Sequence, residues 1–316
     1  MDRTVLITGA TGLIGAALVR HFSSVGDHVV AAVRDVDKSR RMFGSLSGVE
    51  TVFWDVTEPF GGSVPAVDWI VHAASETSSV NFVGHPVETI RTILSGAENV
   101  LRFAAGVSPS SVLFLSTMEV YGSPTVEVVA EGDYGYLDPV EVRSCYPEAK
   151  RMAENMCCAY AREYGVPVKI ARLTQTFGEG VKYDDGRVFA EFARAILERR
   201  DIVLKTPGST ARCYCYIGDA VAAVETILAK GEVAVPYTVA NEDTFCTIRE
   251  MAEALVAKYP ESGSRVVFDF SDSEKRGFAP PFRMKLDCSR LRALGWRPKV
   301  GLMEAFDWMM KDMQKQ

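Results

Sequence analysis

The sequence predicts an α/β fold in which a doubly wound parallel sheet is joined to a smaller C-terminal α+β lobe. In the N-terminal half, short β-branched runs alternate with helical patterns, which is typical of crossover units on a parallel sheet. The runs at residues 5–7 and 112–115 are continuously apolar, as expected of strands buried on both faces. After residue 172 the pattern loosens into shorter elements. We therefore expect a second lobe over the open edge of the sheet, with a ligand-binding cleft between the two.

Each strand of the sheet is expected where a β-branched run is bounded by turn residues. These runs are residues 4–8, 28–33, 51–54, 69–72, 112–116 and 166–172. Helical patterns fill the gaps at residues 13–25, 87–105 and 146–164. Further along we expect helices at residues 188–199, 219–230 and 248–258, a strand at 237–240, and loops at 260–264 and 277–281.

The order of these elements predicts two units. We expect residues 1–174 plus about 213–246 to form the sheet domain, which binds a dinucleotide. Residues of about 175–212 plus 247–316 are expected to form the smaller, substrate-binding lobe. A chain of 316 residues is long enough to bury a substantial core.

Composition and charge exclude several classes of protein. The chain is 47% hydrophobic and 24% charged, with a net charge of −6 and no basic stripe interleaved with aromatics, which disfavours a nucleic-acid surface. The first strand begins near Arg3, and no apolar run approaches the roughly 20 residues of a membrane span, so a cytoplasmic protein without a membrane segment is expected. Its seven cysteines lack paired metal spacings, which indicates reduced thiols and no metal site.

A glycine-rich loop follows the first strand and opens the first helix. Gly9 permits a tight turn, Gly12 lets the backbone approach a pyrophosphate, and Gly15 lets the helix pack on the strand. Amide groups at the helix start, together with Thr11, Leu13 and Ile14, form the predicted anion site. The pattern predicts a dinucleotide-binding Rossmann sheet; the alternative, a generic glycine turn, is disfavoured because strand, loop and helix are all in place.

The end of the second strand bears on which dinucleotide is bound. An acidic residue there takes the ribose 2′-hydroxyl of NAD, whereas a nearby arginine accommodates the 2′-phosphate of NADP. The strand ends Val33-Arg34-Asp35. Placing Val33 at the acid position makes Arg34 the reader of the phosphate and favours NADP; a slip of two residues restores Asp35 and NAD.

Two later strand ends are also expected to contact the cofactor. Asp55 and Val56 follow the third strand, where they are placed to bind the adenine. Ala73 and Ala74 follow the fourth strand, and their small side chains let a dinucleotide approach closely. The histidine before them is either a buried strand-end residue or a direct contact.

Tyr146 and Lys150 stand four residues apart in a predicted helix. Residues four apart share a helix face, so the lysine ammonium is expected beside the phenol. A neighbouring positive charge favours the ionised phenol, which makes tyrosine usable for proton transfer. A surface tyrosine beside a solvated lysine is the alternative, and the upstream glycine loop argues against it.

Further motifs extend this pattern along nearly the whole chain. They are His72-Ala73-Ala74, Leu115-Ser116-Thr117-Met118-Glu119-Val120-Tyr121-Gly122, Arg172-Leu173-Thr174-Gln175-Thr176-Phe177-Gly178 and Leu294-Gly295-Trp296-Arg297-Pro298. With the glycine loop and Tyr146-x-x-x-Lys150, they resemble the extended short-chain dehydrogenase/reductase family, specifically its NAD(P)-dependent nucleotide-sugar epimerases and dehydratases. The resemblance implies transient oxidation at C4 of a nucleotide-diphosphate sugar.

The resemblance also implies roles for single residues. Tyr146 is the proton acceptor, Lys150 binds the nicotinamide ribose and lowers the tyrosine pKa, Thr117 hydrogen-bonds the reacting oxygen, and Ser116 lies along the cofactor. In similar sugar dehydratases the segment at 117–119 reads Thr-Asp-Glu, with the aspartate as proton donor. Here Met118 takes that place, and a thioether donates no proton. Met118 is expected to be a wall of the pocket, and Glu119 either a base or a residue that caps and orients the loop.

On the substrate side the resemblance is looser. Arg212 is expected to pair with the diphosphate, and Gln175 stands where relatives carry an asparagine that contacts it. Ser75 and Thr77 are expected to line the sugar pocket or to be ordinary loop residues. In relatives, the helices expected at 87–105 and 146–164 pair across a twofold axis, which implies a homodimer.

Three functions are compatible with these residues. The first is an epimerase or dehydratase that regenerates its cofactor. The second is an NADPH-dependent reductase of a 4-keto nucleotide sugar or related carbonyl, favoured by Arg34 and by Met118. The third, a nonenzymatic NADP-binding regulator, is disfavoured because Thr117, Tyr146 and Lys150 are intact.

Overall fold

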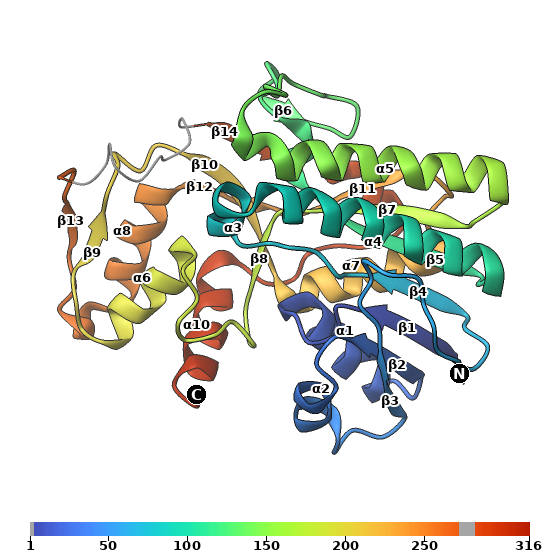
Figure 1. Ribbon diagram of the computed structural model, residues 1–316. Coiled ribbons are helices and arrows are strands. Elements are labelled where there is room, and N and C mark those ends of the chain that lie inside the picture. The colour runs from blue at the N-terminus through green and yellow to red at the C-terminus, as the bar shows by residue number, and fades with distance from the viewer. Residues whose placement is uncertain (1–2, 272–281) are drawn as a thin grey trace.

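A computed structural model describes residues 3–271 and 282–316 of the chain (Figure 1). Its centre is a parallel sheet of seven strands in the order β11-β7-β5-β4-β1-β2-β3. These strands are β1 (Thr4–Thr8), β2 (His28–Val33), β3 (Val49–Phe53), β4 (Trp69–His72), β5 (Ser111–Thr117), β7 (Val168–Leu173) and β11 (Pro236–Val239). The first strand of the chain lies near the middle, so the strand order reverses beside it. That reversal is where doubly wound sheets bind ligands.

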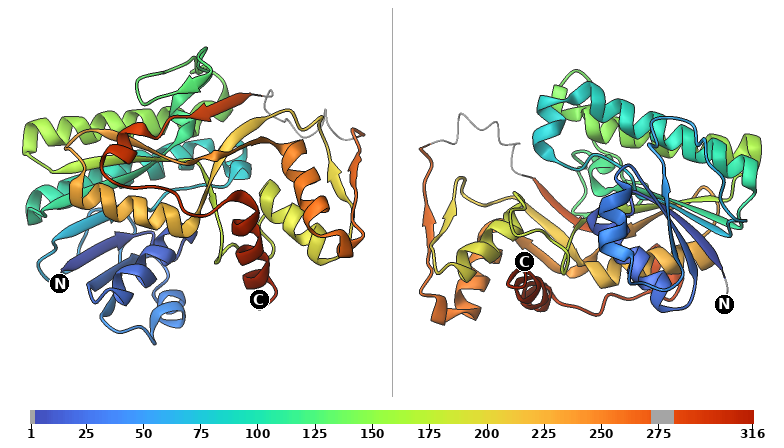
Figure 2. Two further views of the ribbon diagram at one scale, coloured as in Figure 1. Left: turned by 180° about the vertical axis from the view of Figure 1, so that it is seen from behind. Right: turned by 60° about the horizontal axis from the view of Figure 1, so that its bottom comes forward.

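Helices cover both faces of this sheet (Figures 1 and 2). Alternate side chains of β1 belong to two separate cores, Val5 and Ile7 to one and Leu6 to the other. The first core is shared with α1 (Leu13–Ser24), α2 (Val36–Phe43) and α7 (Ile217–Lys230), and the second with α4 (Pro86–Val107) and α5 (Cys145–Tyr164). This arrangement confirms the predicted doubly wound, Rossmann-like fold.

The rest of the chain builds a second sheet and a third core. The sheet runs β12 (Asn241–Thr247), β10 (Ala211–Tyr216), β14 (Arg283–Leu286) and β6 (Val128–Val129), and β8 (Gln175–Phe177) pairs with β10. A separate pair joins β9 (Ile202–Leu204) to β13 (Val266–Phe268). Helices α6 (Val188–Leu197), α8 (Ile248–Lys258) and α10 (Leu302–Met313) enclose the third core. Residues 213–246 therefore contribute to both sheets, and the proposed division into two domains stays a prediction.

In the part of the chain that forms the seven-stranded sheet, the predicted element bounds agree closely with the structure. Strands at 4–8, 28–33 and 69–72 begin and end where predicted, and the predicted helix at 146–164 begins one residue earlier. The strand predicted at 166–172 instead spans β7, because residues 166 and 167 connect it to α5. The loop predicted at 260–264 contains a 3-10 turn, η3 (Pro260–Ser262), and the loop predicted at 277–281 lies outside the described residues.

Several short elements were absent from the prediction. They are α2, β6, β8, β9, β10, β12, β13, β14, α10, the helices α3 (Ser79–Gly84) and α9 (Ser289–Ala293), and the 3-10 turns η1 (Met118–Tyr121) and η2 (Val142–Ser144). Among the helices in the described part of the chain, none is long and apolar enough to cross a membrane. All seven cysteines are free thiols.

Candidate functional site

A cleft at the carboxyl ends of β1, β4, β5 and β7 brings the sequence motifs together. Because parallel strands end at the same edge of a sheet, residues far apart in sequence meet there. Of the predicted site residues, the lining includes Gly9, Gly12, Leu13, Ile14, Gly15, Ala73, Ser75, Thr77, Ser116, Thr117, Met118, Glu119, Tyr146, Lys150 and Gln175.

The glycine loop has the geometry of an anion site. Gly9 has φ +66°, and a Cβ there would lie 2.7 Å from the backbone of Ala74. A Cβ on Gly15 would lie 2.2 Å from the carbonyl oxygen of Gly9, so the helix packs on the loop only without a side chain. The N-cap of α1 is Gly12, with no side-chain cap and no acidic residue in the first turn. Its amides therefore face the cleft unblocked, which fits the pyrophosphate of a dinucleotide.

Tyr146 lies in the wall of the cleft, stacked on an aromatic ring. Its ring and that of Phe82, from α3, are 4.2 Å apart at 13°. Burial raises the pKa of the phenol well above its usual range, the charge of Glu119 raises it further, and the Thr117 hydroxyl and the Arg143 guanidinium lower it. Arg143 is the cation that lowers this pKa, and the lowering expected from Lys150 stays a prediction.

Lys150 lies one turn further along α5, fully buried. Its Nζ donates to the carbonyl oxygen of Leu115 at 2.8 Å and lies 4.7 Å from the centre of the Phe114 ring and 6.0 Å from that of Tyr146. Burial lowers the pKa of its ammonium to about 8, and the charge of Glu154 opposes that shift. The chain thus holds a cation next to the phenol at neutral pH, at an energetic cost.

A buried network lies behind Lys150. Ser116 Oγ donates to Glu154 at 2.5 Å, and the guanidinium of Arg172 donates to both oxygens of the same carboxylate, at 3.0 Å from Nε to Oε1 and 2.6 Å from Nη2 to Oε2. Arg172 also donates to the carbonyl oxygen of Glu131 and to the Tyr134 hydroxyl. Both charges of the pair are therefore compensated, and the network fixes α5 against β5 and β7.

The segment after β5 forms the opposite wall. The Thr117 hydroxyl accepts a bond from the amide of Glu119 at 3.2 Å, which leaves its own proton free to donate. Met118 is 3% exposed, and its sulfur accepts a bond from Thr174 Oγ1 at 3.2 Å, so it packs as a wall. Glu119 is ion-paired, because Arg143 Nη2 donates to its carboxylate at 3.0 Å, and its role as a base or as a residue that orients the loop stays a prediction.

Comparison with known proteins identifies the family. Residues 5–241 match the model of the NAD dependent epimerase/dehydratase family. UDP-glucuronic acid decarboxylase 6 of Arabidopsis thaliana is 33% identical, over 98% of this chain and 88% of the relative. The chain belongs to the NAD-dependent epimerase/dehydratase family. It is therefore an enzyme of the extended short-chain dehydrogenase/reductase type, as the motifs predicted.

Solved structures agree with the fold of the enzyme. The UDP-glucose 4-epimerase of Thermotoga maritima, solved with UDP-glucose, is 20% identical and covers 99% of each chain, with a TM-score of 0.81. The dTDP-glucose 4,6-dehydratase of Streptomyces venezuelae, solved with NAD, is 21% identical over 99% of this chain and 97% of that one, also with a TM-score of 0.81. These likenesses show that the chain has the same fold as these two enzymes.

Some predicted site residues of the enzyme lie outside the cleft lining. Asp55 uses its carboxylate to accept bonds from the amide and hydroxyl of Thr57. Val56 is buried beneath α4. Arg212, on β10, places its guanidinium 4.9 Å from the Phe282 ring, and its buried Nε has no hydrogen-bond partner among the described residues. Thr11, Ala74 and Arg34 border the glycine loop or the end of β2 without lining this cleft.

The sequence analysis did not name Phe82 and Arg187, which line the cleft, or Arg143, whose guanidinium lies 4.7 Å from the centre of the Phe82 ring. Phe82 and Arg143 surround Tyr146, and Arg187 lines the far wall, where Asp185 holds its guanidinium through contacts of 2.6 to 3.1 Å. No local pattern distinguishes Phe82 or Arg187. Arg143, three residues before Tyr146, was visible as a cation one helical turn from the phenol.

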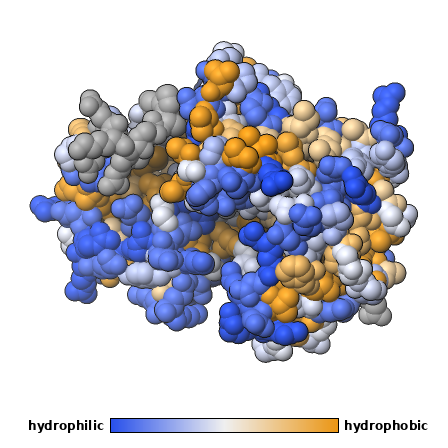
Figure 3. All heavy atoms as spheres, viewed as in Figure 1, coloured by the Kyte–Doolittle hydropathy of each residue, from blue (hydrophilic) through white to orange (hydrophobic). Residues whose placement is uncertain are grey.

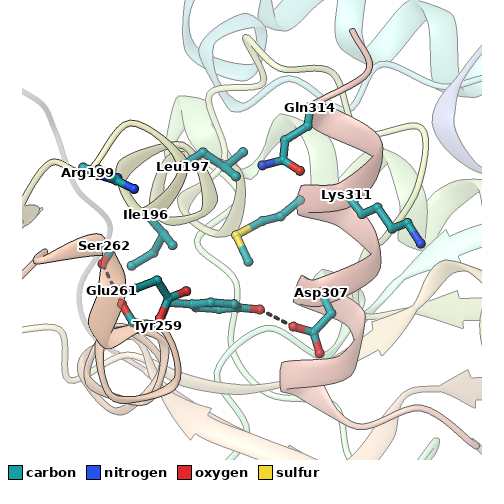
Figure 4. Close-up of a pocket in the computed structure, with 10 residues that line it drawn as sticks. Ile196, Leu197, Arg199, Tyr259, Glu261, Ser262, Asp307, Lys311 and Gln314 are labelled. Carbon is teal, nitrogen blue, oxygen red and sulfur yellow. Dashed lines mark hydrogen bonds between the residues drawn. The ribbon is translucent and has the colours of Figure 1, made fainter.

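The enzyme has another pocket in its C-terminal part, between α6 and α10 (Figure 4). Its floor is apolar, with Ile196 and Leu197, and the Tyr259 hydroxyl points across it to hydrogen-bond Asp307. None of the motif residues lines it. The motif-lined cleft is therefore the candidate active site.

Proposed function

We propose that the enzyme binds a nucleotide-diphosphate sugar against an NAD(P) cofactor and oxidises the sugar transiently at C4, with Tyr146 as the acid/base. The observation that supports this most is that the uncapped start of α1, Thr117, Tyr146 and Lys150 all meet in one cleft. The cofactor, when bound, accepts the hydride from the carbinol carbon. The chain's own part is to move the hydroxyl proton and to hold the sugar in place.

In this proposal each side chain has one task. Tyr146 takes the proton of the C4 hydroxyl and returns it when the ketone is reduced. The free O–H of Thr117 donates to the reacting oxygen, and Lys150 supplies a nearby positive charge. Gln175, Ser75 and Thr77 contact the sugar or diphosphate, and Arg187, which lines the cleft, supplies a cation for the diphosphate.

Decarboxylation of a uronic acid is the favoured outcome of that oxidation. UDP-glucuronic acid decarboxylase 6 of Arabidopsis thaliana, 33% identical, and UDP-glucuronic acid decarboxylase 1 of Xenopus tropicalis, 30% identical, are relatives of this chain. A ketone at C4 makes the C5 carboxylate a β-keto acid, which loses carbon dioxide once the ketone oxygen is stabilised. Met118 provides no proton to a departing hydroxyl, which disfavours dehydration by the route of the Thr-Asp-Glu dehydratases.

The second candidate is net reduction of a 4-keto nucleotide sugar by NADPH. Arg34 at the end of β2, and Met118 in the place of a proton donor, favour this candidate. The two candidates share the site and differ in cofactor balance.

One experiment tests both. The purified enzyme is incubated with UDP-glucuronic acid, UDP-glucose or a 4-keto nucleotide sugar, and the reduced cofactor and sugar products are followed together. A changed sugar without net cofactor change supports the leading proposal, and stoichiometric consumption of NADPH supports the second. Tyr146→Phe abolishes turnover, whereas Tyr164→Phe, at an exposed position on the same helix, does not. No change with any substrate refutes both.

We also propose that the enzyme is a homodimer. Helices α4 and α5 pack side by side and expose Val87, Ile90 and Met152, at 69%, 39% and 54%. Apolar residues also gather around β6 and the adjacent end of α5 on the face shown in Figure 3. An apolar face on two neighbouring helices favours a self-complementary interface. Sedimentation equilibrium tests this, and a monomer at all concentrations would refute it.

A further inference from the structure

Glu154 is a buried carboxylate that has no task in the proposed reaction. It follows Lys150 by four residues on α5, so the two side chains lie on the same face of the helix. The Lys150 ammonium donates to the carbonyl oxygen of Leu115. Glu154 accepts the hydroxyl of Ser116, the next residue of β5, at 2.5 Å. One turn of α5 is therefore tied to the end of the strand that presents Thr117.

The carboxylate of Glu154 is itself held from a third element of the fold. Arg172 of β7 lies opposite Ser116 in the parallel register, and its guanidinium donates to both carboxylate oxygens. Arg172 is 1% exposed and Glu154 is 7% exposed. Charge-assisted bonds of this kind are strong in a buried network and fix the position of the charge. Glu154 thus has one defined position relative to Lys150.

Other titratable groups also lie near the Lys150 ammonium. Cys157, one turn beyond Glu154 on α5, is fully buried, and burial raises the pKa of its thiol well above its usual range. His72, at the end of β4, is a neutral ring, because burial and the charge of Lys150 lower its pKa to about 3. Tyr146 carries a charge only after it has released its proton. Of the groups that the structure describes around this ammonium, Glu154 is the one that supplies a negative charge at neutral pH, which favours the protonated lysine.

We propose that Glu154 is a positioning residue of the reaction, which holds the Lys150 ammonium in place beside β5 and in its charged form. The inference rests on the proposed function, in which Lys150 supplies the positive charge next to Tyr146. Burial disfavours that charge, and the charge of Glu154 offsets part of this effect. Glu154 does not line the cleft, so it acts on the reaction through Lys150 and Ser116.

Titration of Lys150 in the whole enzyme tests this without turnover. The enzyme is labelled with carbon-13 at the lysine Cε atoms, and the Lys150 resonance is the one that Lys150→Met lacks in the NMR spectrum. The wild-type midpoint is expected at about pH 8. Glu154→Gln keeps an acceptor for Ser116 but removes the charge, so the Lys150 midpoint should fall by about one pH unit. Glu154→Asp keeps the charge and should restore a midpoint close to that of the wild type, and Glu163→Gln, at an exposed position on the same helix, is the matched control and should not change it.

The pH dependence of single turnover with UDP-glucuronic acid is the second measurement. At pH 8 half of the wild-type Lys150 is protonated, whereas a midpoint lower by about one unit leaves roughly a tenth protonated. The wild type should therefore be about fivefold faster than Glu154→Gln at pH 8. The two rates should be nearly equal at pH 6, where both proteins hold the proton. A merely structural defect would lower the rate by the same factor at both pH values.

A second variant guards against a failure to fold. Loss of one partner of a buried ion pair is strongly destabilising, whereas Glu154→Gln/Arg172→Met removes both charges and should lower the Lys150 midpoint in the same direction. An unchanged midpoint in either variant, or a rate lowered equally at pH 6 and pH 8, overturns the inference. If the wild type converts no sugar, the proposed function fails, and the titration midpoint still decides whether Glu154 acts on Lys150.

Discussion

The buried ammonium of Lys150 destabilises the fold at neutral pH, and the effect is measurable. Lys150 is 3% exposed, and burial lowers its pKa from 10.5 to about 8. At about 1.36 kcal/mol per pH unit, this shift corresponds to roughly 3 kcal/mol of stability. Lys150→Met keeps most of the apolar volume and removes the charge. The lost bond to the Leu115 carbonyl offsets part of the gain, by about 1–3 kcal/mol.

The sign of the pH dependence follows from proton binding. The folded enzyme releases the Lys150 proton near pH 8, and the unfolded chain releases it near pH 10.5. Between these values the unfolded chain holds more protons, so the free energy of unfolding rises with pH. The cost is full below pH 8 and disappears by pH 10.5. Between pH 8 and pH 10.5, the free energy of unfolding of the wild type should therefore rise by roughly 3 kcal/mol relative to that of Lys150→Met.

Urea unfolding followed by circular dichroism, at intervals from pH 7 to 10.5, measures the difference. Groups other than Lys150 titrate in both proteins and cancel in the comparison. Lys311→Met, at an exposed position in α10, is the control and should run parallel to the wild type. Lys150→Met should also lose catalytic activity. Parallel pH curves for wild type and Lys150→Met would refute the reasoning, since they would mean that the ammonium is solvated.

Three further predictions concern the same cleft. Burial and the neighbouring lysine lower the pKa of His72 from 6.5 to about 3. The free energy of unfolding of the wild type should therefore fall by roughly 5 kcal/mol as the pH falls from 6.5 to 3. His72→Gln should flatten this pH dependence of stability, measured by acid unfolding. Gly15→Ala should weaken dinucleotide binding by at least about tenfold, because its Cβ meets a carbonyl oxygen, whereas Gly106→Ala, with nothing within 4 Å, should bind normally. Arg143→Gln should raise the pKa of Tyr146 further. Because oxidation needs the ionised phenol, the limb on which the single-turnover rate rises with pH should move to higher pH; an unmoved limb contradicts this.

The elements of the seven-stranded sheet were predictable because the sequence patterns that indicate them are local. Buried parallel strands are continuously apolar, so β1, β2 and β4 have the bounds that the sequence predicted. Helix α2 was missed because it is only 8 residues long and mostly polar (VDKSRRMF), although Asp35 three residues before Lys38 was a visible cap signal. The strands of the second sheet were missed because most are short and pair with strands that are distant in the sequence, so no local pattern indicates them.

The site residues that belong to a sequence motif were predictable, and those brought to the site only by tertiary contacts were not. The glycine loop and Tyr146 converge because the strand order brings them to one edge. The stacking of Phe82 on Tyr146 depends on how α3 packs, which no local pattern encodes. The effect of Lys150 on the pKa of Tyr146 stays a prediction: helical spacing gives proximity but not desolvation, and burial is the larger influence on both pKa values.

The ion pair between Glu119 and Arg143 bears on the steps that follow hydride transfer, and not on hydride transfer itself. Oxidation of the carbinol needs only Tyr146, the nearby cation and the cofactor. Epimerisation needs a change of sugar face, and dehydration needs a base at the neighbouring carbon, where the carboxylate of Glu119 is engaged by Arg143. Loss of carbon dioxide needs neither, since the carbon–carbon electron pair stays on C5 and passes to the C4 ketone as an enolate, which then takes up a proton at C5. A cleft with an apolar Met118, and with Glu119 ion-paired to Arg143, is therefore better suited to decarboxylation, or to simple reduction, than to dehydration.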